Sequence, residues 1–102
     1  MTIRVTLLVL YCERLEECRL FYANLGLDFA AEQHGQGPGH YAAVLSGGTV
    51  FELYPVRAGL EKSALRLGLA IDGSAATPPL ASGRHRLTDP DGRVVEVDTS
   101  AD

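Results

Sequence analysis

Two histidines flank a glycine-rich stretch in the first half of the chain, and imidazole is a common ligand of divalent transition metals. The stretch EQHGQGPGHYA runs from Glu32 to Ala42 and places His34 and His40 on either side of three glycines and one proline. Three interpretations fit this composition: a metal site, a phosphate-binding loop and a turn. A phosphate-binding glycine loop leads into a helix N-terminus, and no helical pattern follows these glycines, so we exclude that interpretation.

The same composition favours a hairpin between two strands, because glycine supplies positive φ and proline fixes φ in short connections. In a hairpin the two histidines face each other. A metal site there would need a third ligand, for which Glu32 is the sole nearby candidate. Another alternative places the loop beside a cavity, with His40 or Tyr41 bonding a ligand. The sequence favours a solvent-facing hairpin whose histidines are polar strand ends.

Length and charge restrict the classes of partner. The chain has 102 residues, a formal net charge of −4 and only nine Lys and Arg residues. This length predicts one domain, residues 1–102. Nucleic acid and anionic membranes bind clustered positive charge, so a sequence with no basic run excludes both as partners. The apolar start of the chain is too short to span a bilayer. Cys12 and Cys18 are the only cysteines, which predicts reduced thiols, with Cys18 in the core, in a cytoplasmic protein.

The spacing of apolar residues divides the first half into a strand, a helix and three further strands. Ile3–Tyr11 is apolar on both faces, as in a buried strand. Arg14–Leu25 has apolar residues at helical spacing, with Gly26 as its C-terminal cap, but no good N-cap residue precedes it. The three further strands are expected at Leu27–His34, His40–Leu45 and Thr49–Tyr54.

The second half repeats part of the first at an offset of 44 residues. Residues 40–55 align with residues 84–99, with a turn before the last strand of each half. The alignment pairs Glu52 with Glu96 among apolar neighbours, where an unpaired carboxylate is costly to bury. Residues 65–71 are the expected counterpart of the first strand.

The repeat is incomplete after its first strand. Only twelve residues, two of them prolines, separate Ile71 from Arg84. This is too short and too broken for a helix, so the second half is predicted to lack one. A sheet face left without its helix predicts a homodimer.

The expected βαβββ order, the passage LEECRLFYANLGLDF, the strand FELYP and the closing DPDGRVVEV together resemble the vicinal oxygen chelate superfamily. That superfamily includes glyoxalase I, the bleomycin resistance proteins and the extradiol dioxygenases. The resemblance covers about residues 3–99 and is weakest at 72–83. It implies an α+β fold of paired βαβββ modules that form a curved mixed sheet. Module one would span about residues 3–55, and a shortened module two, lacking its helix, about residues 64–99.

Catalytic members of this superfamily bind a divalent metal with ligands from the first and last strand of each module. The resemblance places the last-strand positions on Glu52 and Glu96, and the first-strand positions on Leu7 and Arg66. Leucine and arginine cannot ligate a cation. The metal site therefore looks degraded and no cofactor is expected, although Glu52 and Glu96 are the ligands if a divalent metal binds. A Glu52–Arg66–Glu96 charge cluster is expected in its place.

These features predict a small-molecule-binding protein of the glyoxalase/bleomycin-resistance type that works as a homodimer. The alternative is a divalent-metal-dependent lyase, isomerase or dioxygenase that uses Glu52 and Glu96, and a third is an interaction module with no cavity ligand. No catalytic residue is assigned. If the ligand is acidic, Arg66 is expected to bind its carboxylate or phosphate through two hydrogen bonds. The expected ligand-binding residues are Glu52, Arg66, Glu96, His40 and Tyr54.

Other conspicuous residues have structural interpretations. Tyr22 is expected to pack in the core. His85 lies between Arg84 and Arg86 on an expected solvated strand. The DPDG stretch at Asp89–Gly92 lacks the remaining ligands of a calcium loop and is expected to be a turn.

Overall fold

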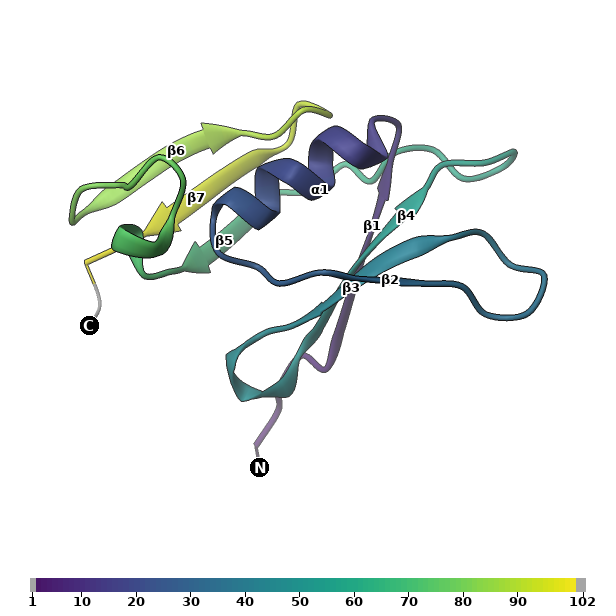
Figure 1. Cartoon of the computed structure of the whole chain (residues 1–102), viewed down its shortest axis with the longest axis horizontal. Helices are drawn as coiled ribbons and strands as arrows, with labels where there is room; N and C mark the ends of the chain where they lie inside the picture. The colour runs from purple at the N-terminus through teal and green to yellow at the C-terminus, as the bar shows by residue number, and fades with distance from the viewer. Residues whose placement is uncertain (1, 101–102) are drawn as a thin grey trace.

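The computed structural model describes residues 2–100 and contains one helix and seven strands in two mixed sheets (Figure 1). Short 3₁₀ turns lie at Ser46–Gly48 and Gly73–Ala75. The elements are β1 (Leu7–Cys12), α1 (Leu15–Asn24), β2 (Ala30–Glu32), β3 (His40–Val44), β4 (Val50–Pro55), β5 (Leu67–Ala70), β6 (Arg84–Thr88) and β7 (Val94–Asp98). No helix of residues 2–100 has the length and apolar character needed to cross a membrane.

The two sheets have the same internal order. The first runs β1-β4-β3-β2 and the second β5-β7-β6, and each has a parallel pair followed by an antiparallel pair. Strands β3 and β6 begin at residues 40 and 84, and β4 and β7 at residues 50 and 94, so the predicted offset of 44 is confirmed. The α+β class and the paired modules are likewise confirmed, with the sheet divided into one part per module.

Two predicted strands are shorter than expected. The first begins at Leu7 rather than Ile3, because β4 starts opposite Leu7. The residues before Leu7 contact the turn that precedes β4, where Arg4 donates to the Gly47 carbonyl oxygen and the Thr49 hydroxyl donates to that of Val5. The strand predicted at Leu27–His34 is reduced to Ala30–Glu32, since only these residues pair with β3. In both places apolar composition extends beyond the reach of the neighbouring strand.

Helix α1 ends as predicted, but the group that caps its N-terminus comes from a distant part of the sequence. At its C-terminus Gly26 has a positive φ of 114°, and the N–H groups of Gly26 and Leu27 donate to the carbonyl oxygens of Ala23 and Tyr22. This is the paired hydrogen bonding of a Schellman cap. At the N-terminus the Asp91 carboxylate accepts hydrogen bonds from the backbone N–H groups that precede the helix. A residue of the second module therefore supplies the missing N-cap.

The second module lacks a helix, as predicted. Its place is taken by the turn at Gly73–Ala75, and Gly73 packs so closely that a Cβ atom there would lie 2.4 Å from the Leu80 carbonyl oxygen. The chain then returns to the first module, where the Thr77 N–H donates to the Asn24 carbonyl oxygen at the end of α1.

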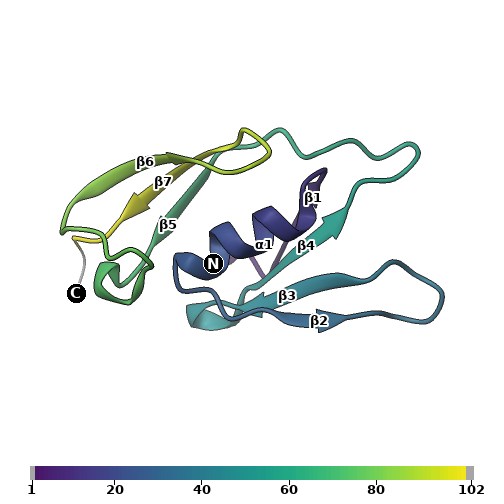
Figure 2. The ribbon, with the colours of Figure 1, turned by 45° about the horizontal axis from the view of Figure 1, so that its top comes forward.

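Helix α1 lies between the two sheets (Figures 1 and 2). Tyr22 on the helix is fully buried and its ring lies 5.3 Å from that of Phe51 on β4. The same hydrophobic cluster contains Val95 and Val97 of β7. Helix α1 thus packs mainly on the first sheet and shares one hydrophobic cluster with β7 of the second sheet.

The predicted turn at Asp89–Gly92 is also the buried junction between the modules. The Tyr22 hydroxyl donates to Asp89 Oδ2 over 2.6 Å, and Arg93 Nε donates to the same oxygen over 2.8 Å. Arg93 also donates to the carbonyl oxygens of Tyr11 and Ser63. The guanidinium therefore joins the turn of the second module to β1 and to the segment between the modules.

Charge states in this junction follow from its burial. Desolvation, together with the Asp89 carboxylate, raises the pKa of the Tyr22 phenol, so Tyr22 acts as a neutral donor. Burial opposes the charge on Arg93, but the hydrogen bond and charge of Asp89, together with the contribution of Cys12, outweigh that effect and raise the pKa of Arg93. The buried cation faces the carboxylates of Asp89 and Asp91.

Replacing this cation tests the junction. Arg93→Met leaves two buried carboxylates without their partner and is expected to lower the free energy of unfolding by about 3–5 kcal/mol in urea denaturation. Arg66→Met is the control, because the Arg66–Glu96 pair is more than half exposed, at 59% and 52% of the two side chains. Its loss is expected to cost less than about 1 kcal/mol. Equal destabilisation by the two substitutions would contradict a junction centred on Arg93.

Candidate functional site

The face of the first sheet that points away from α1 carries the candidate site. Strand alternation places Phe51 and Leu53 toward the helix and Glu52 and Tyr54 on the opposite face. The register puts Ala42 of β3 beside Glu52. The uncovered face, as we name it, comprises Ala30, Glu32, His40, Ala42, Val44, Leu7, Val9, Tyr11, Val50, Glu52 and Tyr54.

His40 is at the centre of the polar end of this face. Its side chain is only 1% exposed, and its Nε2 lies 3.2 Å from Glu32 Oε1 and 3.8 Å from Glu52 Oε2. Its Nδ1 lies 3.2 Å from the carbonyl oxygen of Pro38. The prediction that His40 faces solvent is wrong, because the register sets it directly opposite Glu32 and under an aromatic ring.

That ring is Tyr54. The His40 and Tyr54 rings are stacked, with centroids 4.0 Å apart and planes inclined by 9°. Tyr11 on β1 lies next to Tyr54, with ring centroids 5.9 Å apart. Partial desolvation, with the nearby charge of Glu52, raises the pKa of the Tyr54 phenol, so Tyr54 is a neutral donor at this site.

The remaining predicted site residues lie on the second sheet. Arg66 Nη2 lies 2.6 Å from Glu96 Oε2, and Glu96 sits opposite Gly68 of β5. Because Gly68 and Ala70 have little or no side chain, the outer face of this sheet has a hollow of about 280 Å³ bordered by Glu96 and Arg84.

The structure therefore brings together three of the five predicted site residues and separates the other two. Glu52, His40 and Tyr54 meet on the uncovered face, whereas Arg66 and Glu96 pair on the other sheet. Within residues 2–100 no ion pair joins Glu52 to either of them. The expected three-residue charge cluster is thus divided into two pairs within one chain.

The superfamily's metal position does not fit these residues. The β1 residue beside Glu52 is Val9, two positions after Leu7, and neither side chain can ligate a cation. Glu96 is neutralised by Arg66 on the second sheet. The ligand set that the resemblance implied therefore lacks a ligand on β1, and its ligand on β7, Glu96, is already paired with the Arg66 guanidinium.

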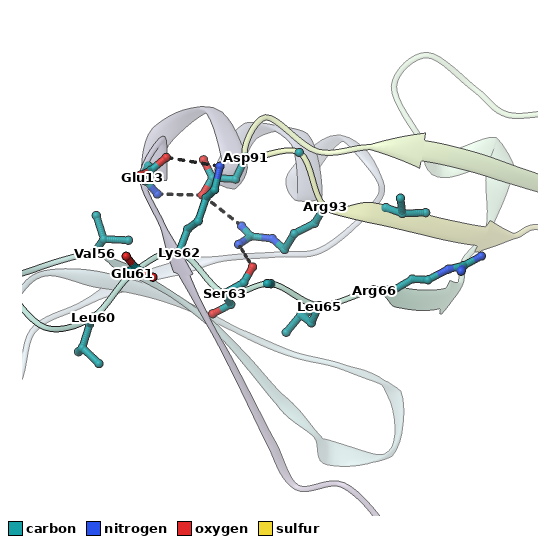
Figure 3. A pocket seen from close by; sticks show the side chains of 13 residues that line it. Glu13, Val56, Leu60, Glu61, Lys62, Ser63, Leu65, Arg66, Asp91 and Arg93 are labelled. Atoms are coloured by element: carbon teal, nitrogen blue, oxygen red, sulfur yellow. Dashed lines mark hydrogen bonds and ion pairs between the residues drawn. The ribbon is translucent and has the colours of Figure 1, made fainter.

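A separate groove of about 1040 Å³ runs along the segment that links the modules (Figure 3). Lys62 extends across it toward Glu13 and Arg93 toward Asp91, and Arg66 lies at its far end. Arg66 is the only predicted site residue among those that line it. The groove is therefore distinct from the uncovered face.

Other residues singled out in the sequence have structural contacts. Tyr41 points toward α1, where its hydroxyl donates to Glu16, so it does not border the site. His85 bonds the Ala81 carbonyl oxygen. His34 is largely exposed, but its Nε2 lies 3.5 Å from Glu32 Oε1. Glu32, the third ligand that a metal site at His34 and His40 would need, therefore lies close to His34 as well as to His40.

A second group of potential metal ligands is buried at the junction. Cys12, Cys18 and Asp91 place their ligand atoms within 4.8 Å of one another, a grouping that sequence spacing did not reveal. The Arg93 guanidinium donates to all three side chains. A fixed cation of the protein thus already fills this position, and both cysteines are buried free thiols.

Comparison with solved structures is decisive for the fold. TnmS3, an antibiotic binding protein from Streptomyces sp. CB03234, matches with a TM-score of 0.66 and 20% identity over 95% of both chains. An integron cassette protein from the mobile metagenome of V. cholerae matches with a TM-score of 0.63 and 21% identity over 95% of both chains.

The oxidase ChaP-H2 matches with a TM-score of 0.62 and 11% identity over 95% of this chain and 93% of the other. The chain has the same fold as these three proteins, in agreement with the resemblance to the vicinal oxygen chelate superfamily. No protein-family model and no curated protein matches the sequence. The chain therefore shares its fold with these structures although its sequence is only 11–21% identical to theirs.

Proposed function

We propose that this vicinal oxygen chelate protein binds a small organic molecule on the uncovered face of its first sheet. The observation that carries the proposal is the cluster of His40, Glu52 and Tyr54 on a sheet face that no element of residues 2–100 covers. Pockets for small molecules combine apolar walls with a few polar anchors, and this face offers both. A structural neighbour, TnmS3, is an antibiotic binding protein, which supports the same class of function.

The composition of the face favours a flat aromatic ligand that carries a positive charge. Tyr54 and Tyr11 supply aromatic surface, and Val9 supplies an apolar wall. Glu32 and Glu52 supply negative charge at one end of the face. Aromatic rings and carboxylates together attract cations.

Binding is preferred to metal-dependent catalysis through Glu52 and Glu96. That alternative requires both carboxylates to reach one ion, and they lie on separate sheets with different partners. We also propose the cytoplasm as the compartment, since Cys12 and Cys18 are free thiols.

We further propose that the protein is a homodimer in which two copies complete each site. Leu7 and Val44 are 55% and 72% exposed on the uncovered face. A second copy packed on this face would remove their apolar surface from water. The outer face of the second sheet carries Arg84 and Arg86 beside Asp98 and Glu96, and its arginines can face the glutamates of the uncovered face.

Ligand binding is tested with two probes that share one ring and differ in charge. Tryptamine, a cation, and indole-3-acetate, an anion, are titrated into chelator-treated protein followed by ¹H–¹⁵N NMR. Tryptamine is expected to bind several-fold more tightly and to shift amide signals of β3 and β4. Tyr54→Ala is expected to weaken tryptamine binding by about 5–10-fold, the worth of one aromatic contact.

Tyr41→Ala is the matched control, because Tyr41 lies on the helix-facing side of the same sheet. It is expected to leave tryptamine binding unchanged. The proposal is wrong if neither probe shifts the first sheet, or if the shifts fall on β5 to β7.

The dimer is tested by sedimentation equilibrium at micromolar concentration. Wild-type protein is expected to be dimeric, and Val44→Asp monomeric, because the substitution buries a charge at the paired face. Leu20→Asp is the control, since Leu20 is 54% exposed on α1, away from that face. A monomeric wild type, or equal effects of the two substitutions, would contradict the paired arrangement.

A further inference from the structure

Four potential metal ligands converge at the base of the β2–β3 hairpin. Register places Glu32 directly opposite His40, and His34 follows Glu32 by two residues at the start of the hairpin loop. The ligand atoms of Glu32, His34 and His40 all lie within 4.8 Å of one another. Glu52 approaches from β4, with its Oε2 3.8 Å from His40 Nε2, but it lies outside this group of three.

The separations between these atoms match those around a bound ion. Glu32 Oε1 lies 3.2 Å from His40 Nε2 and 3.5 Å from His34 Nε2. Ligands at about 2.0–2.1 Å from a tetrahedral zinc ion are about 3.3 Å apart. Glu52 Oε2, at 3.8 Å from His40 Nε2, needs only a small side-chain movement to become the fourth ligand.

The tautomer of His40 adds an independent argument. Both ring nitrogens of His40 face acceptor oxygens 3.2 Å away, the Pro38 carbonyl at Nδ1 and Glu32 Oε1 at Nε2. A metal at Nε2 requires the tautomer with its proton on Nδ1, and the Pro38 carbonyl oxygen is placed to accept a hydrogen bond from that N–H group. In that tautomer Nε2 directs its lone pair at the oxygens of Glu32 and Glu52. Lone pairs that face each other repel, and a cation between them removes the repulsion. Metal-binding histidines are commonly held in this way by a carbonyl on the other nitrogen.

We propose that Glu32, His34 and His40, with Glu52 as the fourth ligand, bind one divalent transition-metal ion of the zinc type. Two imidazoles and two carboxylates suit Zn²⁺ and Co²⁺ better than Mg²⁺ or Ca²⁺, which prefer all-oxygen sites. The two carboxylates balance the charge of the ion, so the preference for a cationic small molecule applies to the metal-free protein. Three of the four ligands come from a single hairpin, so the site does not require a second copy of the chain.

The ion has a route to the site from solvent. His34 is 74% and Glu32 38% exposed at their side chains, whereas His40 is buried beneath Tyr54. The exposed pair captures the ion and the buried imidazole fixes its position. The inference does not depend on the proposed small-molecule ligand, because metal binding is measured without one.

The test uses untagged protein stripped with a chelator and dialysed against Zn²⁺ or Co²⁺. Wild type is expected to bind one ion per chain and to give the intense visible absorption of tetrahedral Co²⁺. Replacing a residue that only supports a metal ligand weakens metal affinity by about 10–100-fold. His34→Gln removes a ligand itself, so it is expected to weaken Zn²⁺ binding by at least that much. His34 is exposed, so this variant is expected to fold as wild type does.

His85→Gln is the matched control, because it removes the chain's third histidine from the other sheet. It is expected to bind the metal as wild type does. The proposal is overturned if wild type binds no Zn²⁺, if His34→Gln binds as tightly as wild type, or if His85→Gln loses affinity equally. Co²⁺ bands of octahedral character in wild type would also overturn the assigned ligand set.

Discussion

The buried guanidinium of Arg93 is the interaction on which the rest of the structure depends. It pairs with Asp89, donates to the backbone of β1 and to the segment between the modules, and places Asp91 where it caps α1. A buried cation is costly unless every donor is used, and here carboxylates, carbonyl oxygens and thiols use them. The turn of the second module and the helix of the first are thereby held at one point.

This junction explains how a chain of 102 residues forms two modules with one helix. Because α1 is fixed between the sheets, Tyr22 packs on Phe51 while its hydroxyl reaches the second module at Asp89. Side chains from the inner faces of both sheets join one hydrophobic cluster with this helix. The outer faces receive no cover from residues 2–100, and the groups that could do chemistry gather on one of them.

The internal repeat made much of the fold predictable from sequence. Alternation and turn chemistry are local, so the offset located two strands of each module and paired Glu52 with Glu96. The contacts of those glutamates were not predictable, because they depend on the strand register and on neighbouring strands. Glu52 meets His40, whereas Glu96 meets Arg66, although the two carboxylates occupy equivalent positions.

The misses share one physical cause. Burial of His40 depends on the register opposite Glu32 and on stacking with Tyr54, neither of which a glycine-rich hairpin sequence contains. The turn at Asp89 was predicted but its burial was not, because the Tyr22 hydroxyl that donates to Asp89 lies 67 residues away along the chain. The one available signal was Glu32, present from the start as the third ligand of the histidine pair.

The most direct test of this account is the state of the two His40 ring nitrogens in metal-free and Zn²⁺-loaded protein, read by long-range ¹H–¹⁵N NMR. The account predicts that Zn²⁺ shifts the Nε2 signal, which faces Glu32 and Glu52, and leaves a proton on Nδ1, which faces the Pro38 carbonyl oxygen. An Nε2 signal that is the same with and without one equivalent of Zn²⁺ would contradict the account.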